Sequence, residues 1–200
     1  ELETRKHDLS FTTEFERGDE FNITISDEFE MLMGPFRIAP DVILQPGDYD
    51  FTSYQLTYRL GTQRRFSGRV SLRAGDFWSG TNTTIGFSSG RIELSPQLSL
   101  EPSYSYNRIE LPEGDFRTEL GRFRVTYTIS PRMYFGGLVQ YNSTQDSFST
   151  NFRFRWEWAP GSEMFVVYSD DRDTDPFGDP RGMELRNRGW AIKINRLFQI

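Results

Sequence analysis

The chain ends in Gly189-Trp190-Ala191-Ile192-Lys193-Ile194-Asn195-Arg196-Leu197-Phe198-Gln199-Ile200, a stretch in which two kinds of side chain alternate. Successive side chains of a β-strand point to opposite faces, so this pattern predicts a strand with one apolar and one polar face. The apolar face would carry Trp190, Ile192, Ile194, Phe198 and Ile200. The polar face would carry Ala191, Lys193, Asn195 and Gln199. Arg196 is the one charged residue at a position of the apolar face. An apolar strand of this kind is typical of the closing strand of an outer-membrane β-barrel, and we predict that it faces lipid.

The same period of two recurs along the chain and predicts about eleven antiparallel strands with no amphipathic helix. The clearest case has Phe152, Phe154, Trp156 and Trp158 on one face, alternating with Asn151, Arg153, Arg155 and Glu157 on the other. We predict that these four rings also face lipid. A gap follows the second predicted strand at residues 34–48, where three prolines argue against regular structure. The parity blurs near Gly90, which suggests a bulge, and the facing of residues 164–169 is not assigned. We predict an all-β protein, an antiparallel transmembrane β-barrel in a single domain over residues 1–200.

Connections between the predicted strands alternate in length. The short ones are residues 17–20, 61–65, 95–97, 130–132 and 159–162, and the long ones are residues 34–48, 75–82, 108–115, 142–147 and 170–184. Outer-membrane barrels have short periplasmic turns and longer extracellular loops. This predicts an outer-membrane location in a Gram-negative-type bacterium, with the C-terminus periplasmic. Single-chain bacterial barrels have even strand numbers. We therefore expect upstream strands before Glu1, or a partner chain, to complete a larger barrel of which this is the C-terminal part.

Composition limits the classes of function. The chain of 200 residues has a formal net charge of -6, which argues against a nucleic-acid partner because phosphate binding needs a basic surface. It contains no cysteine, which excludes disulfides and thiolate chemistry. Lys6 and Lys193 are the only lysines among 23 basic residues. Arginine pairs bidentately with carboxylates, so this balance suits charge ladders inside a barrel, and it fits a bias of genome composition equally well.

Six segments carry a resemblance to a known family. They are Pro46-Gly47-Asp48-Tyr49-Asp50-Phe51, Arg65-Phe66-Ser67-Gly68, Gly75-Asp76-Phe77-Trp78-Ser79-Gly80, Leu111-Pro112-Glu113-Gly114-Asp115-Phe116, Pro160-Gly161-Ser162-Glu163-Met164-Phe165-Val166-Val167-Tyr168 and Asn195-Arg196-Leu197-Phe198-Gln199-Ile200. In their order and spacing the chain resembles the C-terminal barrel region of a bacterial family of unknown function. Members of that family usually carry an N-terminal domain like the family-nine carbohydrate-binding modules. The resemblance implies an outer-membrane location and a missing N-terminal part, and it brings no catalytic motif.

Charged residues at alternate positions form the main candidate site. As lumen-lining residues we predict Arg59, Arg69, Arg73, Arg122, Arg124, Arg153, Arg155, Glu157 and Lys193. Such a ladder sets ion or substrate selectivity in a pore. The alternative is that these side chains pair with lumen carboxylates and fill the interior. Both readings place the ladder on the face opposite the lipid.

Other candidate sites are weaker. Asp171, Asp173 and Asp175 have the one-three-five spacing of a calcium loop. Pro176 and Gly182 replace the glycine and glutamate that such a loop needs, so an ordinary acidic loop is the favoured reading, and no metal or other cofactor is predicted. His7 is the only histidine, so a serine-histidine hydrolase would need it beside a serine such as Ser10.

Three functions remain open from the sequence. The first is an integral outer-membrane barrel that acts as a membrane anchor or conduit and is linked to carbohydrate binding or uptake. The second is an outer-membrane hydrolase with an active site at the rim or in the lumen. The third is a soluble β-barrel binding protein, whose apolar faces would point inward. The expected partners of the first are outer-membrane lipid, lipopolysaccharide, and the barrel-assembly machinery, which would bind the C-terminal strand.

Overall fold

The computed structural model describes residues 3–175 and 183–197, and in this part of the chain every regular element is a β-strand. The strands are β1 (Thr4–Glu14), β2 (Glu20–Leu32), β3 (Phe36–Ala39), β4 (Val42–Leu44), β5 (Gly47–Leu60), β6 (Phe66–Phe77), β7 (Gly80–Ser95), β8 (Leu98–Glu110), β9 (Phe116–Ser130), β10 (Met133–Asn142), β11 (Ser147–Ala159), β12 (Ser162–Asp173) and β13 (Glu184–Asn195). No helix that is long and apolar enough to cross a membrane occurs in residues 3–175 or 183–197.

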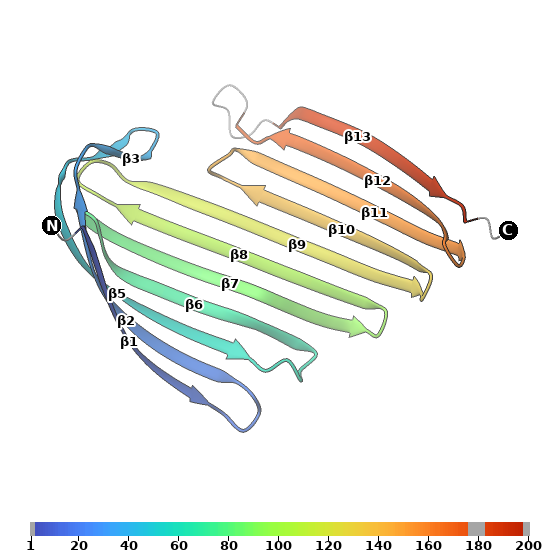
Figure 1. The fold of residues 1–200 in the computed structure, drawn as a ribbon, viewed down its shortest axis with the longest axis horizontal. Helices are drawn as coiled ribbons and strands as arrows, with labels where there is room; N and C mark the ends of the chain where they lie inside the picture. Colours follow the sequence, from blue (N-terminus) through green and yellow to red (C-terminus); the bar gives the residue numbers. More distant parts are fainter. Residues whose placement is uncertain (1–2, 176–182, 198–200) are drawn as a thin grey trace. The chain divides into compact units, whose positions relative to one another are not determined.

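Eleven strands form one antiparallel sheet in the order β1-β2-β5-β6-β7-β8-β9-β10-β11-β12-β13, and β3 pairs only with β4 (Figure 1). The predictions of an all-β fold and of about eleven antiparallel strands are therefore confirmed. Strands β1 and β13 are the two ends of this order and do not pair with each other in the residues described. The described sheet does not close into a barrel.

The chain divides into two compact units. Unit 1 contains Glu1–Ser88 and Ser105–Thr118, and unit 2 contains Ser89–Tyr104 and Glu119–Ile200. Strand β7 passes from one unit to the other at Ser89, whose φ of 53° is left-handed. Left-handed backbone is uncommon for a residue other than glycine. Ser89 adjoins Gly90, where the sequence suggested a bulge.

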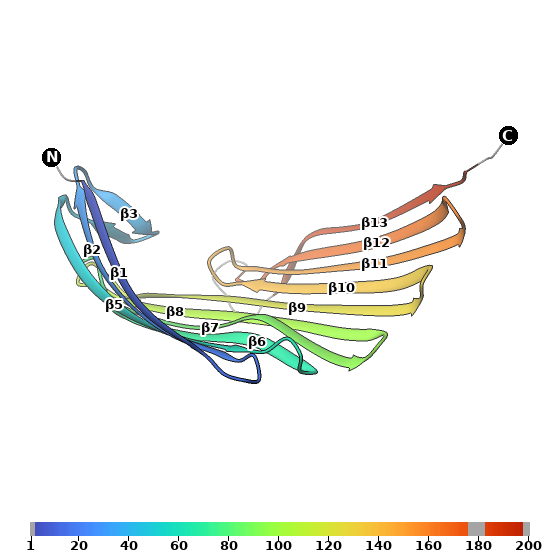
Figure 2. The ribbon, with the colours of Figure 1, turned by 60° about the horizontal axis from the view of Figure 1, so that its bottom comes forward.

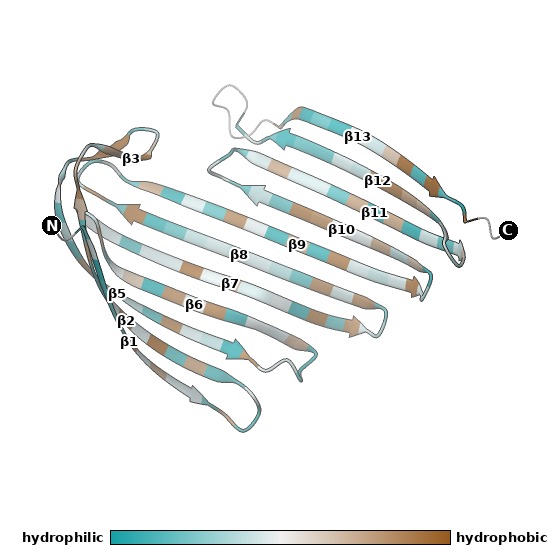
Figure 3. Ribbon diagram, viewed as in Figure 1, coloured by the Kyte–Doolittle hydropathy of each residue, from teal (hydrophilic) through white to brown (hydrophobic). Residues whose placement is uncertain are grey.

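Register fixes the two faces of unit 2. Phe154 of β11 lies opposite Phe135 of β10 and Val166 of β12, and Val166 lies opposite Ile192 of β13. These pairs place apolar side chains on one face and leave the intervening polar residues on the other. The facing of β12, which the sequence left open, is set by its pairing with β11 and β13. Figure 3 shows the alternation of hydrophobic and hydrophilic residues along β9 and β13.

Unit 1 has the same division into two faces. Leu9 of β1 lies opposite Ile25 of β2, which lies opposite Tyr54 of β5, and Leu56 lies opposite Leu72 of β6. The residues between them, such as Ser10, Thr24 and Gln55, form the polar face. The apolar positions thus meet across strands because the period of two is kept in phase by antiparallel pairing.

The connection between β2 and β5 differs from the prediction. Residues 34–48, expected to be irregular, contain the hairpin of β3 and β4, and Figure 2 shows it turning away from the sheet where it leaves β2 and β5. The prediction was wrong because Pro35, Pro40 and Pro46 all lie just outside strand bounds, where no ladder hydrogen bond is lost. Leu44 of the hairpin is fully buried and packs with Val42, Ile109 and Leu111.

One further prediction about a connection was wrong, and so was the predicted extent of the closing strand. The expected long loop at residues 75–82 is a tight turn at Trp78 and Ser79, with a φ of 52° at Trp78. The alternation of short and long connections is therefore interrupted there. The closing strand ends at Asn195, so Arg196 is not in it, and the Leu197 amide instead donates to the Ser162 hydroxyl at 3.1 Å. Phe198, Gln199 and Ile200 lie outside the described residues.

Candidate functional site

One face of β9–β13 in unit 2 gathers the predicted basic residues, and we name it the arginine face. It carries Arg122, Arg124, Arg153, Arg155, Glu157 and Lys193. Arg153 lies opposite Gly136, and Arg155 lies opposite Tyr134. Lys193 of β13 lies opposite Phe165 of β12. The other three predicted residues, Arg59, Arg69 and Arg73, share the polar face of β5 and β6 in unit 1.

Some of these cations have carboxylate partners. Arg155 lies 2.7 Å from Glu163 and 3.6 Å from Glu157, and its guanidinium stacks over the Phe165 ring at 5.7 Å. Arg124 is 4.0 Å from Glu101, the limit for an ion pair. Bidentate or doubled contacts of this kind hold a guanidinium in place. Arg155 therefore fits the alternative in which the predicted charges pair with neighbouring carboxylates.

In unit 1, too, some of the predicted basic residues have carboxylate partners. Arg59 pairs with Glu20 at 2.6 Å, and Arg73 lies 3.5 Å from Glu28, whose carboxylate also accepts from Lys6 at 2.9 Å. Exposed pairs such as these contribute little stability individually. Their effect is to cancel charge on this part of the polar face.

Four of the predicted basic residues differ from these because they have no carboxylate partner in the described part of the chain. Within residues 3–175 and 183–197, the side chains of Arg69, Arg122, Arg153 and Lys193 form no ion pair and no hydrogen bond. Their charge is therefore available to a solute that meets this face. Three of the four, Arg122, Arg153 and Lys193, lie on the arginine face of unit 2, and Arg69 lies in unit 1.

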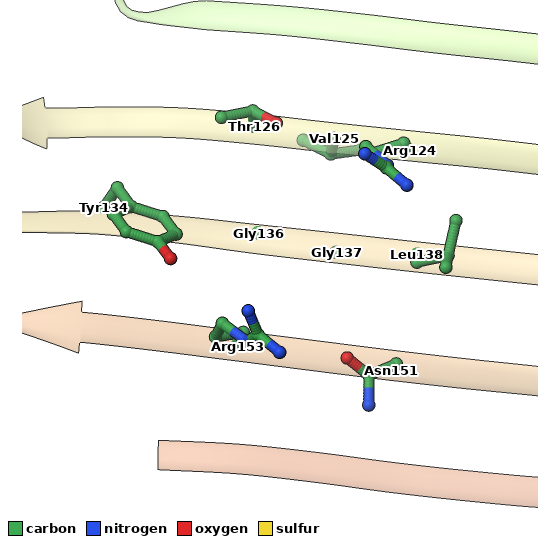
Figure 4. A pocket seen from close by; sticks show the side chains of 9 residues that line it. All are labelled: Arg124, Val125, Thr126, Tyr134, Gly136, Gly137, Leu138, Asn151 and Arg153. Atoms are coloured by element: carbon green, nitrogen blue, oxygen red, sulfur yellow. The ribbon is translucent and has the colours of Figure 1, made fainter. Parts of the chain in front are cut away.

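A depression of about 290 Å³ lies on the arginine face around Gly136 (Figure 4). Arg153 of β11 and Thr126 of β9 lie directly opposite Gly136, and Arg124, Tyr134 and Asn151 complete the surround. A Cβ at Gly136 would meet only the backbone carbonyl oxygen of Arg153, at 4.0 Å. The depression therefore lies where Gly136 has no side chain. The neighbouring atoms leave room for one, so packing does not require glycine at this position.

The opposite face of β9–β13 is lined by rings, and we name it the aromatic face. Ring centroids are 5.8 Å apart for Phe135 and Phe152, 6.3 Å for Phe152 and Tyr168, and 4.6 Å for Tyr168 and Trp190. Separations of this size are attractive for aromatic pairs. The rings form a continuous row across four strands. An almost purely apolar groove of about 270 Å³ lies beside them.

The predicted lipid-facing residues lie on this aromatic face. They are Phe152, Phe154, Trp156, Trp158, Trp190, Ile192 and Ile194, with Trp158 placed by its ring contact with Trp156 at 6.0 Å. The other two, Phe198 and Ile200, lie outside the described residues. On β13, Trp190, Ile192 and Ile194 are 69%, 66% and 65% exposed. In the interior of the sheet, Tyr127 is still 44% exposed. No layer of the described structure covers this face.

A charged cluster that the sequence did not reveal borders the aromatic face. The buried Asp170 carboxylate accepts hydrogen bonds from Arg172 Nε at 2.6 Å, Arg188 Nε at 2.7 Å and the Tyr168 hydroxyl at 3.1 Å. The signal was the change from apolar to charged residues at alternate positions after Tyr168. It was missed because the cluster depends on Arg188 lying opposite Asp170 in the register.

Of the three calcium candidates, Asp173 is held by other contacts. Arg186 lies 2.7 Å from Asp173, whose other oxygen accepts from the Asp175 amide at 3.0 Å. Asp171 lies on the arginine face, opposite Asn187. No group of three potential metal ligands occurs in the described part of the chain. Pro176 and Gly182 lie outside that part.

His7 and Ser10 are not brought together. They occupy positions of opposite parity on β1, so His7 lies on the apolar side, opposite Asp27, and Ser10 on the polar side, opposite Thr24. A serine-histidine pair needs the two side chains within hydrogen-bond reach. This arrangement does not provide the pair that the hydrolase alternative requires.

A buried carboxylate joins two short turns of unit 1. Asp19 accepts from the Gly61 amide at 2.8 Å and the Tyr58 hydroxyl at 3.1 Å, and it pairs with Arg64. The Gly61 amide is the main reason why the pKa of Asp19 lies below its usual value, with Tyr58 and Arg64 acting in the same direction. These contacts tie the β1–β2 turn to the β5–β6 turn.

Comparisons of the chain with protein-family models, with curated proteins and with solved structures found no match. The resemblance drawn from the six sequence segments therefore stays a prediction. Functional assignment rests on the geometry of the two faces. One face is apolar and uncovered, and the other is charged and hollowed at Gly136.

Proposed function

We propose that this chain forms part of the wall of an outer-membrane β-barrel, with its aromatic face in lipid and its arginine face toward a water-filled interior. In this role it is a membrane anchor or conduit. The observation that carries the proposal is the uncovered aromatic face. Exposure of these rings and branched aliphatic side chains to water is unfavourable, whereas in a membrane they contact acyl chains.

The distribution of charge supports the same orientation. Among the outward positions of β11, Phe152, Phe154 and Trp156 form an unbroken apolar run, and the positions between them carry Arg153 and Arg155. In a transmembrane barrel, lipid-facing and lumen-facing residues alternate in this way. In a soluble barrel the arginines would face solvent outside and the rings would fill the interior. An interior lined by these arginines would favour the passage of anions.

The border of the aromatic face also fits the membrane reading. Beyond Tyr168 and Trp190, the next positions on the same face are Asp170 and Arg188, which pair at 2.7 Å. Tyrosine and tryptophan are enriched at membrane interfaces, with charged groups beyond them in the headgroup region. The paired charges would mark the outer limit of the hydrocarbon on β12 and β13.

The wider role is part of the same proposal. Following the family resemblance, the barrel would anchor or serve a carbohydrate-binding portion of the protein, in the outer membrane of a Gram-negative-type bacterium. Closure of the sheet would come from further strands or from a partner chain, because a membrane sheet cannot leave an open edge in lipid. Lipopolysaccharide and the barrel-assembly machinery would be its partners in the membrane.

The four tryptophans give a direct test. Trp156, Trp158 and Trp190 lie on the aromatic face, whereas Trp78 packs with Phe36, Tyr49 and Phe51 beside the β3–β4 hairpin. We expect brominated acyl chains to quench the fluorescence of a variant that keeps only Trp190. A matched variant that keeps only Trp78 should not be quenched, because its ring is on the polar side.

Equal quenching of the two variants, or none in either, would overturn the proposed orientation. Cell fractionation of the full-length product separates the remaining alternatives. A product extracted only by detergent, with steady single-channel conductance, supports a conduit, and extraction without conductance supports an anchor. A folded product that needs no detergent would instead favour the soluble binding protein.

A further inference from the structure

We infer that the depression around Gly136 binds a small solute that carries an oxyanion, either a carboxylate or a phosphate. The inference deepens the proposed function, because it names the class of solute that the interior of the barrel would hold. Binding itself requires only the folded arginine face. It can therefore be tested without assuming that the chain lies in a membrane.

The shape of the site comes from one absent side chain. Gly136 of β10 lies between Arg153 on β11 and Thr126 on β9. Tyr134 and Leu138, two residues to either side on β10, stand at the ends of the depression. Its volume of about 290 Å³ is at the lower limit for ligand pockets, so the solute must be small.

Two guanidinium groups lie on either side of this depression. Arg124 lies opposite Leu138 and Arg153 lies opposite Gly136, so the two arginines are separated by one strand and two residues. With strands about 4.8 Å apart and a rise of about 3.3 Å per residue, their Cα atoms are roughly 12 Å apart. Long side chains from both sides can therefore reach one solute above Gly136, and Figure 4 shows Arg124 and Arg153 flanking it.

The charge balance around the depression favours an anion. Arg153 forms no ion pair or hydrogen bond in the described structure, and Arg124 shares only Glu101, at 4.0 Å. Arg122, the next cation on β9, also forms no ion pair among the described residues. Of the other acids of this face, Glu157 and Glu163 are engaged by Arg155, and Asp171 does not line the depression. Positive charge is thus left over at the depression.

The chemistry of the lining selects an oxyanion. A guanidinium presents its donors in a planar fork that matches the oxygens of a carboxylate or phosphate. The Asn151 amide, the Tyr134 hydroxyl and the Thr126 hydroxyl add neutral hydrogen-bonding groups around the two forks. A neutral sugar would accept hydrogen bonds from the guanidinium groups through its hydroxyls but would leave their positive charge uncancelled.

The test is an NMR titration of the full chain folded in detergent micelles, at constant pH and ionic strength. The probes are sodium phosphate, sodium succinate and glucose. We expect saturable shifts of the Asn151 and Gly137 amides with phosphate, succinate or both, and none with glucose. A response to only one anion identifies the class of oxyanion. Linear shifts without saturation, or an equal response to glucose, would overturn the inference.

Three variants locate the site. Arg153→Gln should lower the affinity about tenfold, the effect of losing one charge-assisted hydrogen bond. Gly136→Leu should abolish binding by filling the depression while leaving both arginines in place. Arg132→Gln removes the same charge from the exposed β9–β10 turn and should bind as the parent does. Unchanged affinity in Arg153→Gln and Gly136→Leu would contradict the assignment.

The outcome is distinguishable from failure of the proposed function. If brominated lipid does not quench Trp190 but phosphate still saturates at Gly136, the membrane role is wrong and the oxyanion site stands. If Trp190 is quenched and no probe saturates, the barrel stands and the site does not. The dispersion of the amide resonances in the spectrum before titration confirms that each variant is folded.

Discussion

Gly137 of β10 lies directly opposite Phe152 of β11, and a Cβ built on Gly137 would be 3.1 Å from two atoms of the Phe152 ring. The absence of a side chain lets this ring lie over the backbone of β10 and reach Phe135 at 5.8 Å. Such covering of a strand glycine by an aromatic ring is a known means of stabilising a sheet. Its neighbour Gly136 has no such constraint, so the two adjacent glycines have different reasons to be there.

Substitution of the two glycines should therefore have unequal effects. Gly137→Val should lower the free energy of unfolding by about 1–2 kcal/mol, because the added methyl groups displace the Phe152 ring. Gly136→Val should change it by about 0.5 kcal/mol or less, because the space is open and valine suits a strand. Urea titration of the protein in detergent micelles measures both. Equal losses would show that strand conformation, and not the ring, decides the effect.

Removal of Leu44 should be costly because it is the only fully buried large side chain in the described part of the chain. We expect Leu44→Ala to lower the free energy of unfolding by about 2–5 kcal/mol. The adjacent Ile43 is 39% exposed and provides the matched control, with an expected loss of about 1 kcal/mol or less for Ile43→Ala. Trp78 fluorescence reports on both, since its ring packs against the same cluster. A control that lost as much as Leu44→Ala would contradict the assigned core.

Acid should weaken the tie between the two short turns of unit 1. The pKa of Asp19 is lowered in the folded protein, chiefly by the Gly61 amide. A lowered folded pKa means that the stabilisation is complete above the unfolded value, about 3.9 for aspartate, and is lost as pH falls through the folded pKa. Asp19→Asn should be less stable than the parent at pH 7, and the difference should vanish in acid. Unfolding midpoints across pH 7 to pH 2 measure this.

The exposed Asp41 in the β3–β4 turn supplies the control for that series. Asp41→Asn should lose as much stability in acid as the parent does. If Asp19→Asn also loses as much stability in acid as the parent, other carboxylates determine the acid response and the turn contact is not responsible.

The cluster on Asp170 should behave as a unit. Asp170→Asn removes the charge that holds Arg172 and Arg188 together, so the two guanidinium groups repel each other and the unfolding midpoint should fall. Adding Arg188→Gln should recover part of the loss, because it removes the repulsion. A double-mutant cycle measured by thermal unfolding in detergent gives the coupling. Additive effects of the two substitutions would contradict a shared network.

Much of the candidate site was predictable because it depends on a local pattern. Arg153 and Arg155 were placed on one face and Phe152 and Trp156 on the other from the period of two alone, and the register agrees. Which arginines would have partners was not predictable. Arg155 meets Glu163 across the β11–β12 turn, whereas Arg153 lies opposite Gly136 and has no such neighbour. That difference depends on register between strands.

The sequence by itself determined the strands of this protein and the two chemistries of their faces, because side-chain alternation is a property of the extended backbone and needs no other segment. Tertiary structure alone decided the β3–β4 hairpin, the tight turn at Trp78, the Asp170 cluster and the depression at Gly136. Each of these depends on which residue a neighbouring strand places opposite. A strand sequence fixes where its own side chains point, and only pairing fixes what they meet.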